Sequence, residues 1–196
     1  VVPEIIPDLR GALKGHHMVI SIAAGVTLEF LESELPPGTP VIRAMPNNPC
    51  LIRQGASVMA PGRWAGPEHE ELAERVLRAV GLVTKLPEHL LDAVTALSGS
   101  GPAYVYLFIE ALIDAGVLVG LPREVARTLV LQTVLGAVGM VQSTGRHPAE
   151  LRDMVTSPAG TTVAGLAVME QAGLRGVLMN AVKAAWARSR ELGRKT

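Results

Sequence analysis

Aromatic residues are scarce in this chain, and cysteine is almost absent. Phe, Trp and Tyr make up 3% of the 196 residues although 48% are hydrophobic, so any core is built mainly from Ala, Val and Leu. Cys50 is the single cysteine, which excludes an internal disulfide and fits a reducing cytosol. No charged and then apolar leader opens the chain, so we expect a cytoplasmic protein.

An excess of charge of one sign is lacking as well. Lys and Arg number 18, and Asp and Glu also number 18. This balance argues against nucleic-acid binding, which requires a basic excess or patch. The 5 histidines are scattered without ligand spacing, so we expect no metal site. A glycine-rich phosphate turn is missing too, because no G-x-G-x-x-G follows an apolar strand.

Strand and helix patterns alternate up to about Pro87, and only helical patterns follow. Strands are expected at 18–24, 41–45, 56–60 and 82–86, with helices at 27–35 and 67–80. Further helices are expected at about 102–119, 123–143, 148–154, 162–171 and 174–193. The alternation predicts an open α/β sheet in residues 1–87 and an all-helical domain in residues 88–196.

Two helical runs, 102–120 and 129–141, are apolar enough to raise the question of a membrane. Glu110 and Asp114 lie one turn apart within the first run, and a charge at the bilayer centre costs about 2.5–3.5 kcal/mol. We therefore expect no membrane insertion. Helices this apolar need more partner surface than one copy offers, which favours an intertwined dimer.

Two stretches place small and hydroxylated residues in front of an apolar helix. Residues 156–162 (TSPAGTT) offer Ser and Thr oxygens as helix caps, and the first-turn amides favour a bound carboxylate. Residues 92–104 (DAVTALSGSGPAY) put a Gly/Ser turn ahead of a long helix with Pro102 in its first turn. Without further context, both stretches could be ordinary capped helices.

Four more motifs accompany these stretches: SIAAGV at 21–26, RAMPNNP at 43–49, GLP at 120–122 and HPAELRD at 147–153. In this order, over essentially the whole chain, they resemble pyrroline-5-carboxylate reductase, the last enzyme of proline synthesis. The resemblance implies a Rossmann-like partial domain followed by an all-α dimerisation domain. It also implies NADPH or NADH as cofactor, 1-pyrroline-5-carboxylate as substrate, L-proline as product, and a homodimer that may belong to a larger ring.

The resemblance also implies a gap at the start of the chain. Family members begin with a strand, a glycine-rich turn and a helix that hold the dinucleotide phosphates, whereas residues 1–7 resemble the segment after the first βα units. Where the family commonly has Lys-Pro, this chain has Val2-Pro3. We therefore expect roughly the first half of the nucleotide-binding domain to be absent, and dinucleotide binding by these 196 residues to be weak.

For the substrate, the resemblance implies contacts from Thr161 and Thr162. The Thr162 hydroxyl is the candidate catalytic group, as a polariser and positioner of the ring nitrogen, since an alcohol is a poor acid near neutral pH. Its plainer reading is a helix cap. Ser157 and the Gly160 and Thr161 amides can donate to the carboxylate. The other expected substrate-binding residues are Glu88, Met154 and Val155.

Three positions near the expected substrate contacts differ in how well they match the family's residues. Glu88 matches a family glutamate that would favour a cationic iminium, and its plainer reading is a surface residue at a domain joint. Met154 stands where some relatives have asparagine, whose side-chain hydrogen bonds methionine cannot make. Ala159 replaces a more usual glycine, so a positive φ there would be strained.

For the cofactor, the expected contacts follow the ends of predicted strands, where ligands bind in open α/β sheets. Asn47 could orient the nicotinamide carboxamide, and small Ala23 and Ala24 would let the ring lie on backbone. The plainer reading of these segments is strand-to-helix turns. The full set of expected cofactor-binding residues is Val1, Val2, Pro3, Ile22, Ala23, Ala24, Met45, Pro46, Asn47, Ser100 and Gly101.

Two other functions stay open at this point. A β-hydroxyacid dehydrogenase also has a sheet domain followed by helices, but its family carries a catalytic lysine in the helix after a Gly-rich turn, and no lysine lies between Ser98 and Gly120. A catalytically inactive remnant that serves only as a helical oligomerisation module would fit the missing phosphate turn.

Overall fold

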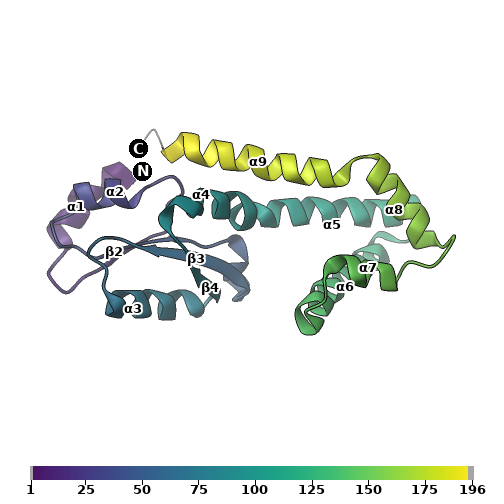
Figure 1. The fold of residues 1–196 in the computed structure, drawn as a ribbon, viewed down its shortest axis with the longest axis horizontal. Helices are drawn as coiled ribbons and strands as arrows, with labels where there is room; N and C mark the ends of the chain where they lie inside the picture. Colours follow the sequence, from purple (N-terminus) through teal and green to yellow (C-terminus); the bar gives the residue numbers. More distant parts are fainter. Residues whose placement is uncertain (1, 194–196) are drawn as a thin grey trace. The chain divides into compact units, whose positions relative to one another are not determined.

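The computed structural model describes residues 2–193, with Val2 and Pro3 described for the backbone alone (Figure 1). The chain forms two compact units: Val1–Pro102 with Ala181–Thr196, and Ala103–Asn180. We call them the sheet unit and the helical unit. The expected division into domains 1–87 and 88–196 stays a prediction.

The sheet unit is built on four strands, β1 (Val19–Ser21), β2 (Val41–Met45), β3 (Gly55–Pro61) and β4 (Gly81–Lys85), in the order β1-β2-β3-β4. β1 is parallel to β2, β3 is antiparallel to β2, and β4 is parallel to β3. All four predicted strands are present, but β1 is shorter than expected. Its pairing ends at Ser21 because the chain then turns through Gly25, whose φ is +77°.

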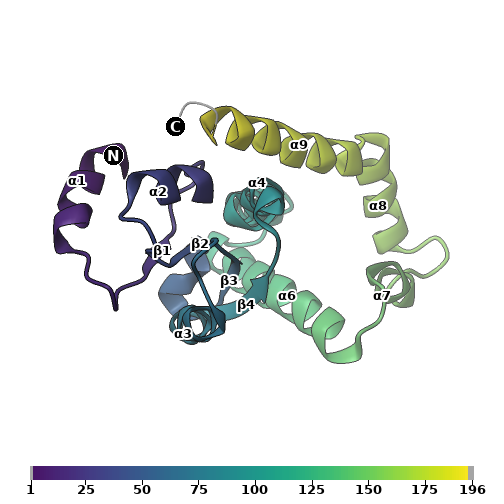
Figure 2. The ribbon, with the colours of Figure 1, turned by 60° about the vertical axis from the view of Figure 1, so that its left-hand side comes forward.

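Helices cover both faces of the sheet. α3 (Pro67–Arg78) packs on one face, and α1 (Val2–Ala12), α2 (Leu28–Glu34) and α4 (Leu91–Val94) lie on the other (Figure 2). The first face buries Ile42, Ala44, Met59, Ala73, Leu77 and Val83. The second buries Ile6, Val26, Leu28, Leu31, Leu35, Val41, Ala60 and Leu91. The alternation of strand and helix thus produces the predicted layered α/β unit.

Between these elements lie short turns of helix that shape the strand ends. η1 (Asn48–Ile52) follows β2 and η2 (Glu88–Leu90) leads into α4. η3 (Thr95–Gly99) is a π-helical turn, in which the Ser100 amide donates to the Thr95 carbonyl at 2.8 Å. Turns of this kind recur at functional sites.

One buried hydroxyl in the sheet unit has no hydrogen-bond partner among the described residues. Ser57 on β3 is 2% exposed, and its Oγ is unpaired. Because desolvating a hydroxyl without a partner is unfavourable, Ser57→Ala should leave the free energy of unfolding unchanged or raise it by up to about 1 kcal/mol. Urea unfolding followed by circular dichroism measures this; a loss of more than about 1 kcal/mol would mean that the hydroxyl is satisfied in solution.

The helical unit contains most of α5 (Gly101–Leu118), then α6 (Arg123–Thr144), α7 (Pro148–Met154), α8 (Thr161–Gln171) and the first part of α9 (Leu174–Gly193). These helices confirm the predicted ones closely. At the α5–α6 turn, a Cβ on Gly116 would lie 2.8 Å from the Ala126 Cβ, and Arg123 donates to Asp114 at 2.8 Å. Arg175 hydrogen-bonds to Glu170 near the α8–α9 turn and holds the pKa of that carboxyl below its usual value.

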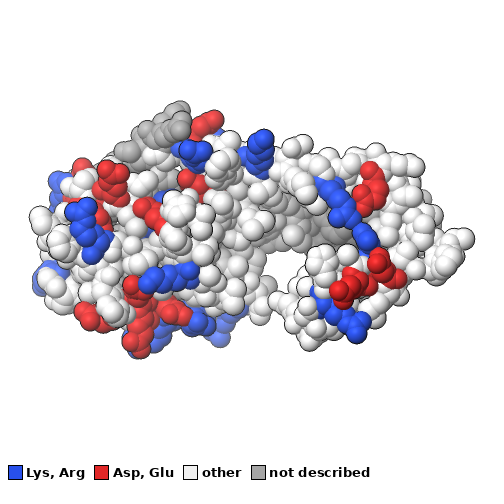
Figure 3. Space-filling view, viewed as in Figure 1, with Lys and Arg blue, Asp and Glu red and all other residues white. Residues whose placement is uncertain are grey.

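The helical unit has almost no core of its own. Among its described residues, Ala126 alone is buried, whereas apolar side chains such as Leu118 (86% exposed) and Leu135 (67% exposed) face outward. Residues Glu88–Leu118 and Arg123–Thr144 are long and apolar enough to cross a membrane by length and composition. On the face of the molecule that Figure 3 shows, the side chains of Lys and Arg lie interspersed with those of Asp and Glu.

Candidate active site

The expected cofactor residues of the sheet unit follow the ends of two neighbouring strands. β1 and β2 run parallel with Ser21 opposite Arg43, so Ile22–Ala24 and Met45–Asn47 leave the sheet at the same edge. Ile22 is 61% exposed and Ala24 is also exposed, as a ligand-facing turn requires. We call this region the strand-end edge. The carboxyl ends of strands are where open α/β sheets bind ligands.

The π-turn η3 packs against the strand-end edge. Asn47 Nδ2 donates to the Ser98 carbonyl at 3.0 Å, and the Ala56 amide donates to Asn47 Oδ1 at 2.9 Å. A Cβ on Gly99 would lie 2.6 Å from Met45 Cε, so the end of the Met45 side chain lies directly against this glycine of η3. The structure therefore brings Met45 and Asn47 to the segment that carries Ser100 and Gly101. Asn47 keeps one Nδ2 hydrogen and one Oδ1 lone pair for a ligand.

Two further expected residues, Val2 and Pro3, lie in the first turn of α1. Val1 lies outside the described residues. Pro46 stands between β2 and η1, within the strand-end edge.

Glu88 is a half-buried residue tied to two other elements of the sheet unit. Its Oε1 accepts from the backbone amide of Leu28 at 2.6 Å and from Arg43 Nη1 at 2.9 Å. The Arg43 side chain is 7% exposed and that of Glu88 is 30% exposed. Glu88 thus neutralises a buried guanidinium and accepts from the first residue of α2, where a negative charge is favourable. Its expected contact with substrate stays a prediction.

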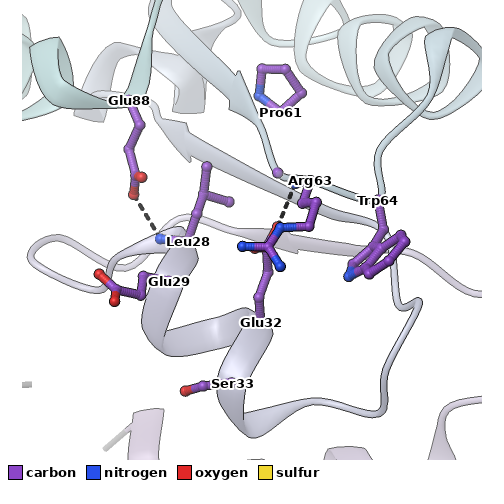
Figure 4. A pocket seen from close by; sticks show the side chains of 9 residues that line it. Leu28, Glu29, Glu32, Ser33, Pro61, Arg63, Trp64 and Glu88 are labelled. Atoms are coloured by element: carbon purple, nitrogen blue, oxygen red, sulfur yellow. Dashed lines mark hydrogen bonds between the residues drawn. The ribbon is translucent and has the colours of Figure 1, made fainter.

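A pocket of about 580 Å³ opens beside Glu88 (Figure 4). The helix α2 contributes Glu29, Glu32 and Ser33, and the segment after β3 contributes Arg63 and Trp64. Because Pro61 at the end of β3 pairs with Ile42 near the start of β2, the pocket lies away from the strand-end edge. The Glu32 carboxylate already accepts from the Arg63 amide. The pocket is therefore not the place where the expected cofactor residues meet.

Apart from Glu88, the expected substrate residues lie in the helical unit, from the end of α7 to the first turn of α8. The Gly160 amide donates to the Ser157 carbonyl at 3.0 Å and closes a turn whose third residue, Ala159, has a φ of +58°. Gly160 is the N-cap of α8, and its lack of a side chain leaves room for the Ser157 hydroxyl. Thr161 and Thr162 form the first turn of α8. We call residues 156–162 the α8 turn.

The expectation that a Ser or Thr oxygen caps α8 is wrong. The turn through Ala159 places Gly160 at the N-cap, and among the described residues no side-chain cap bond closes this helix end. The first amides of α8 are therefore open to an anion from outside the turn. Thr156, by contrast, is engaged: its hydroxyl donates to the Arg152 carbonyl at 2.6 Å.

The two residues ahead of the α8 turn are exposed. Met154 is 62% exposed and Val155 is 65% exposed, at the end of α7. The Met154 sulfur accepts from Arg146 Nη1 at 3.2 Å, whereas the Val155 amide donates to the Arg152 carbonyl at 3.2 Å. The Met154 side chain thus has a local partner on the segment before α7.

The positive φ expected to be strained at Ala159 is present. A non-glycine residue in this region costs about 1–2 kcal/mol, because its Cβ crowds the following carbonyl oxygen. Ala159→Gly should therefore raise the free energy of unfolding of the helical unit by about 0.5–1 kcal/mol, after the entropy that glycine adds to the unfolded chain. Differential scanning calorimetry measures the shift. A lower Tm would show that Ala159 does not adopt a positive φ in solution.

Sequence reasoning missed the partnership of Arg43 with Glu88 and the contact between Asn47 and Ser98. A signal for the first was present: an arginine inside the apolar strand pattern VIRAM (residues 41–45) requires a carboxylate if the strand is buried. The pattern of β2 alone does not indicate which of the chain's acidic residues supplies it.

Helices on both faces of a sheet, with small residues at a shared strand-end edge, place the sheet unit in the Rossmann-like class of nucleotide-binding folds. The pyrroline-5-carboxylate reductase dimerisation family matches residues 88–192. The pyrroline-5-carboxylate reductase of Methanosarcina acetivorans is 50% identical over 192 residues, which cover 98% of this chain and 71% of that protein. Pyrroline-5-carboxylate reductase 3 of Xenopus laevis is 46% identical over 195 residues, covering 100% and 71%.

A solved structure gives the same result. Plasmodium falciparum pyrroline carboxylate reductase with NADP bound superposes with a TM-score of 0.93 at 35% identity, covering 98% of this chain and 77% of that one. The chain therefore belongs to the pyrroline-5-carboxylate reductase family, as its motifs indicate.

Proposed function

We propose that this protein reduces 1-pyrroline-5-carboxylate to L-proline with NADPH or NADH. The observation that carries the proposal is the open amino end of α8, where no side chain caps the first amides among the described residues. Such an end binds a carboxylate, and the substrate is an imine that bears one. Membership of the reductase family supplies the chemistry that fits these groups.

Four residues of the α8 turn, Ser157, Gly160, Thr161 and Thr162, have a role in this proposal. The Thr161 amide and the Ser157 hydroxyl donate to the carboxylate of the substrate, and Gly160, whose own amide is bonded to the Ser157 carbonyl, leaves the room that this contact needs. The Thr162 hydroxyl contacts the ring nitrogen and orients the C=N bond. The dinucleotide, when bound, supplies the hydride that adds to the imine carbon, and a proton on the nitrogen completes the amine. An iminium accepts hydride better than a neutral imine, so a group that stabilises the protonated nitrogen assists the reaction.

On the cofactor side, the proposal assigns the nicotinamide half to the strand-end edge. Ile22–Ala24 and Met45–Asn47 offer small side chains and backbone groups at one edge of the sheet. The available hydrogen and lone pair of Asn47 suit a carboxamide, which needs one acceptor and one donor. Ser100 and Gly101 close this edge from the side of η3.

A β-hydroxyacid dehydrogenase is the weaker enzyme reading, because its catalytic lysine has no counterpart between Ser98 and Gly120. An oligomerisation module without activity would use the helical unit alone. At the strand-end edge, the Asn47 side chain is bonded through its Nδ2 to Ser98 and through its Oδ1 to Ala56, and this order favours an enzyme over such a remnant.

We also propose that the helical unit is buried in a homodimer, in the cytoplasm, and that the dimer can assemble into a larger ring. Its exposed apolar helices and its match to a dimerisation family support self-association over a bilayer. Glu110 and Asp114 within α5 add a cost of about 2.5–3.5 kcal/mol each at a bilayer centre.

Self-association should therefore be detectable at low concentration. We expect sedimentation velocity at micromolar concentration to show a dimer or larger species and no stable folded monomer, because one buried side chain cannot hold the helices of Ala103–Asn180 together. A well-folded monomer would contradict the proposed dimer.

The activity is tested by mixing the purified chain with 1-pyrroline-5-carboxylate and either NADPH or NADH. We expect substrate-dependent loss of absorbance at the reduced-nicotinamide band, with proline formed in equal amount. A β-oxo acid in place of the imine, which a β-hydroxyacid dehydrogenase would reduce with the same dinucleotide, serves as the matched control and should not react. Absence of proline with both dinucleotides, from the chain and also from a version extended at its start by the family's strand, glycine-rich turn and helix, would refute the proposed function.

A further inference from the structure

We propose that the last two turns of α9 position the cofactor turn, and that Ser189 and Gly193 are the positioning residues. The cofactor turn is residues 22–25, which follow β1. Both ends of this contact belong to the sheet unit, since that unit includes Ala181–Thr196. The kinetic consequence rests on the proposed function, whereas the ordering of the turn can be measured without it.

The first contact joins backbone to backbone. Gly25 is buried with a φ of +77°, and a Cβ on it would lie 3.3 Å from the Gly193 nitrogen and 3.3 Å from Leu192 Cβ. In the other direction, a Cβ on Gly193 would lie 3.2 Å from the Gly25 carbonyl oxygen. Glycine on both sides thus allows the end of α9 to approach the residue directly after Ala23 and Ala24.

The second contact joins the same helix, α9, to the segment that leads into the π-turn η3. Ser189 is 4% exposed, and its Oγ donates to Asp92 Oδ1 at 2.7 Å across 97 residues of sequence. Asp92 lies in α4, which runs directly into the π-turn η3. That turn accepts from Asn47 through the Ser98 carbonyl. One helix end is therefore tied to the cofactor turn and to the segment that holds Asn47.

The cofactor turn needs such support because it has little of its own. Its strand pairing ends at Ser21, Ile22 and Ala24 are exposed, and glycine at position 25 is the most permissive residue for the backbone. If the turn must become ordered when the dinucleotide binds, the conformational entropy lost by the turn lowers the affinity of the protein for the dinucleotide. A turn already held against α9 avoids that loss. The α8 turn, where the substrate is proposed to bind, takes no part in these contacts.

The kinetic test uses the full chain with three variants. Gly193→Val adds a branched side chain against the Gly25 carbonyl, Gly193→Ala adds only the Cβ, and Ser189→Ala removes the bond to Asp92. We expect the KM for the dinucleotide to rise about 5- to 10-fold in Gly193→Val and Ser189→Ala and less in Gly193→Ala, with the KM for pyrroline-5-carboxylate within about 2-fold of wild type. Equal rises in both KM values would overturn the proposal.

A matched control separates positioning from loss of stability. Val83→Ala removes methyl groups from the cluster under α3 and touches neither contact of α9. It should lower the Tm at least as much as the α9 variants do, because deleting buried methyl groups loses their burial and leaves a cavity in the core. Both KM values should remain at wild-type level. A rise in the dinucleotide KM in this control equal to that in Gly193→Val would show that stability alone governs binding.

Amide hydrogen exchange provides the readout that does not depend on activity. In Gly193→Val and Ser189→Ala, the amides of residues 22–27 should exchange at least about 10-fold faster, while those of β3 keep their wild-type rates. If neither the wild-type chain nor its extended version made proline, the proposed function would fail, yet this measurement would still decide the ordering of the turn. Unchanged exchange at residues 22–27 in Gly193→Val would overturn the inference.

Discussion

In a version of the chain extended at its start by the family's strand, glycine-rich turn and helix, Thr162→Ala should lower kcat/KM for pyrroline-5-carboxylate by about 10- to 150-fold. The hydroxyl that this change removes is proposed to contact the ring nitrogen, and a lost hydrogen bond to a charged ligand costs about 1.5–3 kcal/mol. The KM for the dinucleotide should stay within about 2-fold of wild type, because Thr162 belongs to the first turn of α8 and the cofactor residues belong to the sheet unit. Steady-state kinetics with each substrate varied in turn measures both effects.

Thr162→Ser is the matched control for this change. It keeps the hydroxyl and removes only a methyl group, so its kcat/KM should fall far less than that of Thr162→Ala. An Ala variant within about 2-fold of wild type, at equal stability, would mean that Thr162 is an ordinary first-turn residue and that the substrate seat lies elsewhere. The structure already makes one alternative weaker, since Gly160 and not a threonine is the N-cap of α8.

Glu88→Ala should lower the free energy of unfolding of the sheet unit by about 2–4 kcal/mol. The change leaves the Arg43 guanidinium, 7% exposed, without its carboxylate, and leaves the Leu28 amide at the start of α2 without its acceptor. Removing one partner of a buried pair is costly because the other charge stays buried. The 30% exposure of Glu88 keeps the expected loss below the upper range for buried pairs. Chemical denaturation measures it.

Two further variants identify the cause of that loss. Arg43→Met combined with Glu88→Ala removes both charges and should recover at least half of the lost stability. Glu88→Gln keeps an oxygen for the Leu28 amide and should be milder than Glu88→Ala. If Glu88→Gln lowered kcat/KM strongly at unchanged stability, Glu88 would act on substrate, as the family resemblance implies. A loss under about 0.5 kcal/mol in Glu88→Ala would contradict the structural role assigned to the pair.

The helices could be predicted closely from the sequence because local residues punctuate them. Pro122 precedes α6, Pro148 opens α7 and Gly173 separates α8 from α9, and the predicted bounds of α5 to α9 differ from the observed ones by at most one residue. The helix α3 ends two residues before its predicted end, and α1 and α4 are not among the predicted helices. Strands β2, β3 and β4 followed from apolar runs between turn residues. β1 was expected to be longer, since its apolar run continues to Ala24 while its pairing with β2 ends at Ser21.

The contacts that organise the site could not be predicted in the same way. Glu88 meets Arg43 across 45 residues of sequence, and Ser189 meets Asp92 across 97, so neither pair leaves a local pattern. The π-turn at Thr95–Gly99 has no periodic signal, because one turn is too short to show its wider repeat. The cap of α8 was predicted at the wrong residue since the positive φ at Ala159, a property of the folded turn, decides where that helix begins.

The most direct measurement of the central claim is the transfer of deuterium from the cofactor to the product. The chain, extended at its start by the family's strand, glycine-rich turn and helix, is incubated with pyrroline-5-carboxylate and with NADPH or NADH that carries deuterium at both C4 positions of the reduced nicotinamide. We expect mass spectrometry to find one deuterium in the proline formed, on the ring carbon that was the imine carbon. Thr162→Ala should form the same labelled product more slowly. Proline without deuterium, or no proline at all, would contradict the assignment of this chain as an imine reductase that transfers hydride from a bound dinucleotide.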